Sequence, residues 1–293
     1  MNKKILATLF AILAAALYAI NIPFSKLLMD NVDSTMMAGL LYLGAGVGMF
    51  IYTRIGAVFG TKIVKEPLTK AELPYTIAMV ILDIAAPILL MHGLKITTSA
   101  NATLLNNFEI VATSLIALVV FKETVSKKLW GAIALVTLAS VILTFEGAGS
   151  FSFNIGSLMV LGAATCWGFE NNCTRMLSHK SSEQIVIIKG IFSGLGALIA
   201  AVLVGEQIPQ WIYIVAVMIL GFVSYGLSIN FYIMAQAELG AAKTSAYYSI
   251  APFLGVAFSL LMLGERPAIQ FYIALTVLII GTILIVTDTL NEK

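Results

Sequence analysis

Charge is what this sequence most lacks. Only 11% of its 293 residues are Asp, Glu, Lys or Arg, whereas a soluble domain carries about 25%. Because 60% of the residues are hydrophobic and the mean hydropathy is +0.98, polar side chains are too few to cover a globule in water. Soluble enzymes and nucleic-acid-binding proteins are therefore excluded, and the composition predicts an integral membrane protein.

Cysteine and histidine are scarce as well, with two of each. Cys166 and Cys173 lie on one predicted helix, about 10 Å apart along its axis, which is too far for a disulfide. His92 and His179 lie near the ends of separate predicted helices, without neighbours of metal-ligand type. The sequence contains no phosphate-binding glycine loop. We therefore predict no metal, no cofactor and no redox chemistry.

The apolar runs are long enough to span a membrane. A helix needs roughly 20 apolar residues to cross about 30 Å of hydrocarbon. Stretches such as 129–145 are apolar on all sides, unlike the alternating segments of a transmembrane barrel. The predicted fold class is an all-α polytopic membrane protein with ten transmembrane helices, over residues 4–29, 35–54, 74–94, 97–121, 128–146, 155–177, 183–204, 210–234, 240–263 and 268–288.

The distribution of Lys and Arg predicts the orientation. With the N-terminus inside, 13 of the 17 basic residues fall on the cytoplasmic side and Lys189 lies within a span, which leaves three outside: Lys26, Lys95 and Arg266. We therefore expect a multi-pass protein of the cell (plasma) membrane with both termini cytoplasmic. The basic loop 55–73 is expected to contact anionic membrane lipid. A signal peptide is the alternative for the first span, but its apolar stretch continues to Phe24 and favours retention.

The chain contains an internal repeat. Residues 98–123 align with 240–265 at an offset of 142, and residues 18–21 align with 167–170 at an offset of 149. This divides the chain into two five-helix halves, 1–147 and 148–293. Because five is odd, the halves enter the membrane from opposite sides, and such inverted repeats suit alternating access. A duplicated helix bundle without transport activity is the alternative.

These features resemble the EamA-like family of drug/metabolite transporters, over the whole chain. The resemblance rests on the ten helices in two halves, on small-residue runs at 99–102 and 240–242, and on short motifs at matching places: Tyr18-Ala19, Trp167-Gly168, Lys122-Glu123 and Gly264-Glu265-Arg266. Pro252 fits the mid-helix proline common in helix nine of the family, whereas Ile110 stands at the equivalent place in helix four. The resemblance implies a central cavity formed mainly by helices one, three, four, six, eight and nine. It also implies secondary active transport without a nucleotide.

Polar residues gather on the same six helices. A polar side chain within the membrane is costly unless it faces a cavity or a partner. The predicted substrate-binding residues are Tyr18, Asn21, Asn106, Trp167, Glu170, Asn171, Tyr225, Tyr247 and Tyr248. Aromatic faces suit an apolar or cationic part of a substrate, and Glu170 and Asn171 suit an amino group. For any single position, hydrogen bonding between helices is the alternative.

Helix geometry places two pairs of residues at equal depths. Glu170 and Lys189 both lie about 14 Å from the loop near 180, so they are expected to pair directly or through the charges of a substrate. Asp83 and Glu109 both lie about 18 Å from the turn near 95, close to the bilayer midplane. Only Lys189, from the other half, could approach them. We expect Glu109 to carry a coupling proton with Asp83 as its modulator, and two permanently neutral packing groups are the alternative.

The sequence thus predicts a secondary active transporter, a proton-coupled exporter of small amphipathic metabolites such as amino acids or amines. Its predicted partners are the small-molecule substrate, protons and membrane lipid. An intramembrane enzyme is the first alternative, although no set of His or Cys residues shares one depth. A passive pore or scaffold is the second. The identity of the substrate, the direction of transport, the coupling ion and the choice between monomer and homodimer stay open.

Overall fold

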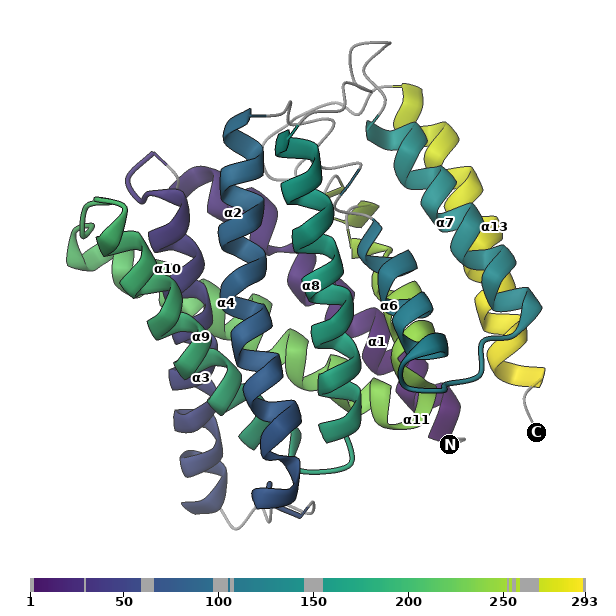
Figure 1. The fold of residues 1–293 in the computed structure, drawn as a ribbon, viewed down its shortest axis with the longest axis horizontal. Coiled ribbons are helices and arrows are strands. Elements are labelled where there is room, and N and C mark those ends of the chain that lie inside the picture. The colour runs from purple at the N-terminus through teal and green to yellow at the C-terminus, as the bar shows by residue number, and fades with distance from the viewer. Residues whose placement is uncertain are drawn as a thin grey trace.

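The structure is a computed structural model, and it describes residues 3–28, 30–58, 66–96, 105, 108–144, 155–251, 253–254, 257–258 and 269–291. These residues form helices and turns and contain no strand (Figure 1). Five of the described helical segments are long and apolar enough to cross a membrane: Ser34–Ala57, Lys70–Leu90, Ser182–Leu203, Trp211–Tyr248 and Tyr272–Thr289. The all-helical polytopic fold is confirmed, and the count of ten spans stays a prediction.

Most of the described helices match the predicted spans to within a few residues. The helices of the N-terminal part are α1 Lys3–Ala19, α2 Asn21–Leu28, α3 Ser34–Val58, α4 Leu73–Ile96, α6 Phe108–Val119 and α7 Lys127–Thr144, and the short 3-10 helix η1 Lys70–Glu72 precedes α4. Those of the C-terminal part are α8 Ile155–Leu177, α9 Ser182–Leu203, α10 Trp211–Gly221, the π-helical turn η3 Phe222–Leu227, α11 Ser228–Tyr248 and α13 Ile269–Asn291. The first part of the predicted span 97–121 lies mostly outside the described residues.

The first predicted span is not one continuous helix. It divides at Ile20 into α1 and α2. The proline at position 23 explains the break, because a proline has no N–H to donate to the carbonyl four residues before it, here that of Ala19. Tyr18 therefore lies at the end of a helix, where the chain changes direction.

The predicted loop at 235–239 is helical. Its residues, Ala-Gln-Ala-Glu-Leu, are strong helix formers, and the helix continues through them. The interruption is confined to Gly240, whose φ of 80° and ψ of 172° leave the helical region. A residue with a Cβ rarely adopts such a backbone, so a single glycine separates the eighth and ninth predicted spans.

Helices far apart in the sequence pack in pairs: α3 with α9, α4 with α8, α1 with α11, and α7 with α13. The α3–α9 pair is held close by glycines. A Cβ on Gly190 would collide with the backbone of Gly46, and one on Gly194 would lie 2.6 Å from the backbone nitrogen of Leu43. Small residues four positions apart, such as Gly190 and Gly194, are typical of such a close-packed helix surface.

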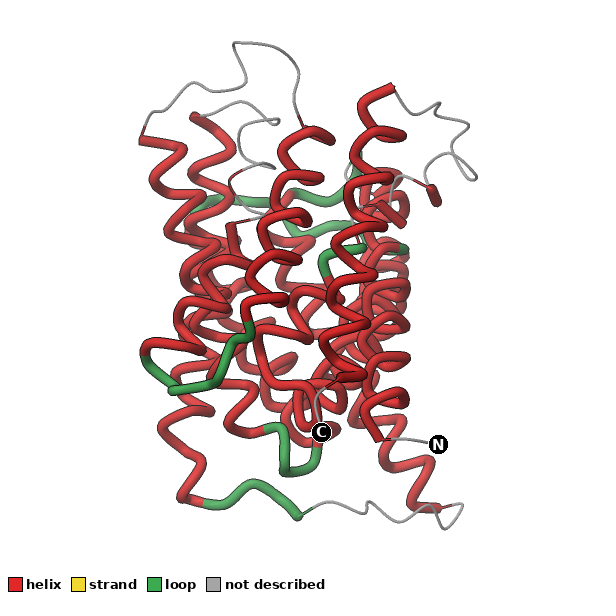
Figure 2. The backbone as a smooth tube through the Cα atoms, turned by 90° about the vertical axis from the view of Figure 1, so that its right-hand side faces the viewer, coloured by secondary structure: helices red, strands yellow, loops and turns green. Residues whose placement is uncertain are grey.

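The arrangement brings the two ends of the chain together. In Figure 1, α7 and α13 lie side by side and run antiparallel. The N-terminus and the C-terminus lie at the same end of the bundle (Figure 2). Five helices, α1, α4, α6, α8 and α11, supply most of the polar side chains that face the interior.

Candidate functional site

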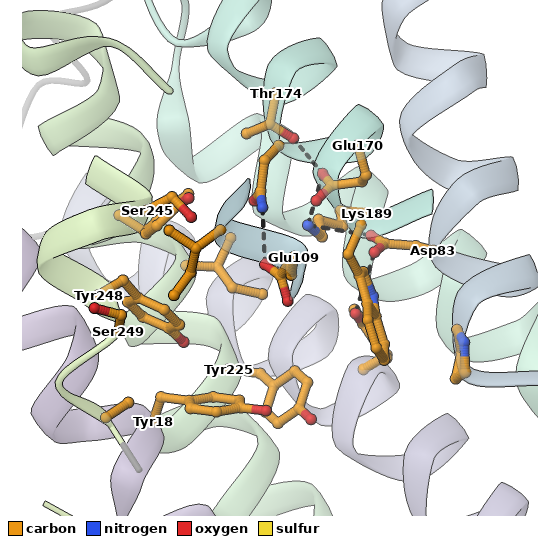
Figure 3. Close-up of a pocket in the computed structure, with 18 of the residues that line it drawn as sticks. Tyr18, Asp83, Glu109, Glu170, Thr174, Lys189, Tyr225, Ser245, Tyr248 and Ser249 are labelled. Atoms are coloured by element: carbon orange, nitrogen blue, oxygen red, sulfur yellow. Dashed lines mark hydrogen bonds and ion pairs between the residues drawn. The ribbon is translucent and has the colours of Figure 1, made fainter. Parts of the chain in front are cut away.

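A cavity of about 300 Å³ lies among these helices (Figure 3). Its walls come from α1, α3, α4, α6, α8, α9, η3, α11 and the turn that follows α11. The polar side chains that line it are Tyr18, Tyr42, Asp83, Glu109, Trp167, Glu170, Asn171, Thr174, Lys189, Tyr225, Tyr232, Ser245, Tyr248 and Ser249. Six of its lining residues are apolar or small: Ala38, Pro87, Leu90, Ile110, Ile229 and Ala251.

Three charged side chains form a buried triad on one wall, which we call the cavity triad: Lys189, Glu170 and Asp83. The Nζ of Lys189 donates a hydrogen bond to Oε1 of Glu170 at 2.8 Å and lies 3.1 Å from Oδ2 of Asp83. All three side chains are at most 7% exposed. The ion pair between Glu170 and Lys189, which their equal depths indicated, is present, and Lys189 reaches Asp83 as well.

Further hydrogen bonds orient the two carboxylates. The Tyr42 hydroxyl donates to Oδ1 of Asp83 at 3.2 Å, and the Thr174 hydroxyl donates to Oε1 of Glu170. Pro87 lies four residues after Asp83 within α4. Because it has no N–H, it cannot donate the helical hydrogen bond to the backbone carbonyl of Asp83. The cavity triad is therefore held in a fixed geometry, which offsets part of the cost of burying its charges.

Glu109 has a different environment. It lies in the first turn of α6, where the helix dipole favours an acid, and its Oε1 accepts a hydrogen bond from Nδ2 of Asn171 at 2.9 Å. No described basic side chain lies within ion-pair distance of it. Figure 3 shows its carboxyl pointing into the middle of the cavity. Asp83 and Glu109 therefore line one cavity, but Asp83 pairs with Lys189 while Glu109 has a neutral partner.

Five tyrosines form a continuous row of ring contacts, which we call the tyrosine arc: Tyr42, Tyr225, Tyr18, Tyr248 and Tyr232. Successive ring centroids lie 5.1, 5.6, 5.5 and 5.0 Å apart. The rings come from α3, η3, α1 and α11, and all of them line the cavity. Their tilted and edge-to-face packing is the arrangement that aromatic rings favour, and it makes one side of the cavity a surface of rings and hydroxyls.

Most of the predicted site residues line this cavity: Tyr18, Asp83, Glu109, Trp167, Glu170, Asn171, Tyr225 and Tyr248. Two do not. Asn21 accepts a hydrogen bond from the Ser25 hydroxyl within α2, and Tyr247 is turned away, with its hydroxyl 3.0 Å from that of Thr289 on α13. Successive residues of a helix point about 100° apart, so Tyr247 and Tyr248 cannot both face one cavity. Asn106 lies outside the described residues.

Two helices outside the six that were expected to form the cavity also contribute side chains to its lining. Tyr42 comes from α3 and Lys189 from α9, the glycine-packed pair. Tyr42 had no polar neighbour at helical spacing to mark its face, so periodicity could not find it. Its position among Gly39, Gly46 and Gly48 was the available signal, because small residues bring this stretch of α3 close to other helices.

A second buried charged cluster, the helix-end cluster, lies outside the cavity and consists of Ser126, Lys243 and Asp288. The Nζ of Lys243 lies 3.1 Å from Oδ2 of Asp288, and the Ser126 hydroxyl donates to Oδ1 at 2.6 Å. Beside it, Oε2 of Glu123 accepts a hydrogen bond from the backbone N–H of Ala241, directly after the break at Gly240. These contacts join the segment between α6 and α7 to α11 and α13.

The described residues contain no group of three or more His, Cys, Asp or Glu side chains arranged to hold a metal ion. Both cysteines are free, as their spacing predicted. The chemistry that the cavity offers is therefore that of carboxyls, one ammonium, an amide and aromatic rings.

Comparison with known proteins identifies the relatives of this chain. The sequence pattern of the EamA-like transporter family matches it twice, over residues 5–145 and 154–287. An "Uncharacterized transporter" of Methanothermobacter thermautotrophicus is 23% identical over 291 residues, covering 94% of this chain and 84% of that protein. A solved chain described only as "Crystal structure of protein" has the same fold, with a TM-score of 0.81 at 16% identity, covering 98% of this chain and 99% of the other.

Proposed function

Because the chain belongs to the EamA-like transporter family and is a polytopic membrane transporter, we propose that it is a secondary active transporter of small amphipathic metabolites that carry an amino group, amino acids or amines, in exchange for protons. One observation carries this proposal. The cavity holds three carboxyls and one ammonium beside the tyrosine arc, so it offers both acidic groups for a proton or an amine and apolar rings for the rest of a substrate.

Charge balance supports the assignment of Glu109 as the principal proton carrier. Lys189 neutralises at most one of the three carboxyls, and its ammonium already contacts Asp83 and Glu170. An ionised carboxyl without a partner inside the membrane costs about 2.5 to 3.5 kcal/mol. Glu109 avoids that cost by holding either a proton or the cationic group of a substrate. Asp83 modulates this exchange, because both carboxyls share one cavity.

The proposed mechanism is alternating access between two inverted five-helix halves, 1–147 and 148–293. The two matched stretches of the family pattern support this division. The helix pairs support it as well, because α3–α9 and α7–α13 each join equivalent helices of the two halves, and α4–α8 is the counterpart of α1–α11. In an inverted repeat, each half supplies the gate of one side.

Contacts between the halves at one end of the bundle fit this mechanism. Glu123 and Ser126 belong to the first half, and their partners, Ala241 and Asp288, belong to the second. Alternating access requires such links to be made in one state and broken in the other. The excess of basic residues supports the proposal that this end, with both termini, lies on the cytoplasmic side of the cell membrane, and the proposed direction of transport is export.

The test uses purified protein in liposomes with an imposed pH gradient. A thermal-shift screen of amino acids, amines and nucleosides first selects the substrate, and its accumulation and the accompanying proton flux are then measured. We expect wild-type protein to concentrate the substrate and Glu109→Gln to abolish concentration, while Asp83→Asn shifts the pH at which it occurs. The matched control is Glu238→Gln, an exposed acid of α11 outside the cavity lining.

The outcomes separate the alternatives. If both Glu109→Gln and Asp83→Asn still concentrate substrate in response to the gradient, the coupling assignment is wrong. If wild-type protein only equilibrates the substrate, it is a passive pore. If the substrate is recovered chemically changed, the protein is an enzyme.

A further inference from the structure

The charges of the cavity distinguish between the two substrate classes of the proposed function. Lys189 is the one basic side chain among the described residues that line the cavity. Its ammonium is contacted by two carboxylates, Glu170 at 2.8 Å and Asp83 at 3.1 Å. The α-carboxylate of an amino acid would be a third anion at this ammonium, in a cavity where Glu109 adds a further acid. Like charges at close distance repel strongly in a medium of low dielectric constant.

A cation, in contrast to a carboxylate, would be attracted by the charges of the cavity. Glu109 points into the cavity, and its hydrogen-bond donor among the described residues is the neutral amide of Asn171. In Figure 3, Tyr18, Tyr225 and Tyr248 surround the space into which Glu109 points. A cation held within about 6 Å of a tyrosine ring is attracted by the face of that ring. An ammonium between Glu109 and these rings would meet one carboxylate and several aromatic faces at once.

We infer that the substrate is an organic monocation, an amine with an apolar or aromatic body, whose cationic group binds between Glu109 and the tyrosine arc. Zwitterionic amino acids are poor ligands because, among the described residues that line the cavity, no second basic side chain is left to bind their carboxylate. This inference rests on the proposed function and narrows it. The cavity of about 300 Å³ lies at the lower end of the size of small-molecule sites, which fits a small compact amine.

The test compares three probes that share one ring: phenethylamine, phenylalanine and 3-phenylpropionate, which are a cation, a zwitterion and an anion. Their binding to the purified full-length protein in detergent is measured by isothermal titration calorimetry at constant pH. We expect phenethylamine to bind at least about tenfold more tightly than phenylalanine, the factor that one repelled or unpaired charge produces, and phenylpropionate to bind most weakly.

Matched variants locate the cationic group. Glu109→Gln should weaken phenethylamine binding about tenfold to a hundredfold, which corresponds to the loss of a charged hydrogen bond. Tyr18→Leu should weaken it about five- to thirtyfold, whereas Tyr18→Phe retains the ring face and should change it less than about threefold. Glu238→Gln and Tyr52→Leu, at exposed positions outside the cavity lining, are the controls and should bind like wild type. The thermal unfolding midpoint of each variant confirms that it is folded.

The inference is overturned if phenylalanine binds as tightly as phenethylamine, if none of the three probes binds, or if Glu109→Gln binds phenethylamine like wild type. Gradient-driven uptake in liposomes separates this failure from failure of the proposed function. Concentration of phenylalanine without that of phenethylamine leaves the transporter proposal standing and rejects the monocation. Equilibration without concentration of any amine or amino acid rejects the proposed function itself.

Discussion

The molecule contains two buried ion clusters that look alike in chemistry and differ in setting. In the cavity triad, Lys189 contacts two carboxylates and lines a cavity. In the helix-end cluster, Lys243 contacts the carboxylate of Asp288, which also accepts a hydrogen bond from Ser126. The charged side chains of both clusters are at most 7% exposed.

The difference shows that burial of an ion pair does not by itself mark a substrate site. In the helix-end cluster, the ammonium of Lys243 pairs with the carboxylate of Asp288 and holds α11 against α13, away from the cavity lining. The cavity triad has an excess of acid, and Glu109 increases that excess. Only a cluster with unbalanced charge and access to a cavity needs a mobile cation, whether a proton or a substrate, to complete it.

The largest effect is expected from removing the ammonium of the cavity triad. Lys189→Met leaves Asp83 and Glu170 buried without their cation, and breaking a buried ion pair in this way costs about 3–5 kcal/mol. The triple variant Lys189→Met/Asp83→Asn/Glu170→Gln removes every charge of the triad. It should recover most of the lost stability, but it should not transport. The measurement is the free energy of unfolding in detergent, together with uptake in liposomes. A triple variant that transports like wild type would show that the triad is structural only.

Removing the ammonium of the helix-end cluster should cost less. Lys243→Met removes the cation beside Asp288, but this carboxylate keeps the hydrogen bond from Ser126, so we expect a loss of stability near the lower end of the range, about 3 kcal/mol. The double variant Lys243→Met/Asp288→Asn should recover the lost stability. In contrast to the cavity variants, the affinity for substrate should stay at the wild-type value, because the cluster lies outside the cavity lining. A change in affinity of tenfold or more would contradict the distinction between the two clusters.

The glycine beside the helix-end cluster should show a smaller effect. Gly240→Ala places a Cβ on a backbone with φ of 80° and ψ of 172° and against the carboxylate of Glu123, and this backbone region, essentially restricted to glycine, alone costs about 1–3 kcal/mol. Gly131→Ala is the matched control. Gly131 lies within α7 with no atom within 4 Å of an added Cβ, so its replacement should stabilise the protein by about 0.5–1 kcal/mol. Unfolding in detergent measures both, and equal signs for the two substitutions would contradict the prediction.

The exposed ion pair of Lys180 provides the baseline for the two buried clusters. Its Nζ donates to Oε2 of Glu66 at 3.0 Å, and this hydrogen bond raises the pKa of Lys180 above its ordinary value. A raised pKa stabilises the fold at pH values below the ordinary lysine pKa, and the contribution is lost as the pH rises through the folded value. Lys180→Ala should therefore lower the unfolding midpoint only slightly at neutral pH, and its curve should merge with that of wild type in strongly alkaline buffer. A difference that grows with pH would contradict this assignment.

Equal depth along a helix was the argument from sequence that reached furthest into the site. It indicated that Glu170 and Lys189 meet, because the distance of each from a short connecting turn follows from the helical rise alone. Equal depth did not determine which residue forms an ion pair with Asp83. Asp83 was expected to act with Glu109, and it pairs with Lys189, which comes from a helix distant in the sequence.

Short-range signals also decided some local features and missed others. The glycines of α3 and α9, spaced four residues apart, are a local feature that the close packing of these two helices depends on. The helical residues at 235–239 were read as a loop because apolar runs, rather than helix propensity, set the predicted boundaries. One glycine with a positive φ was enough to divide the helix there.

What the sequence determined by itself is that this is a membrane protein built of long apolar helices, with its polar residues confined to particular ones. The physical reason is that lipid supplies no hydrogen bonds, so each apolar stretch must satisfy its own backbone as a helix. Only the tertiary structure decided how each helix is rotated about its axis. That rotation turns Tyr248 into the cavity and Tyr247 toward α13, brings Tyr42 to Asp83, and leaves Glu109 with an amide rather than an ammonium. It depends on packing between residues more than a hundred positions apart, such as Gly46 and Gly190, and no local pattern encodes those contacts.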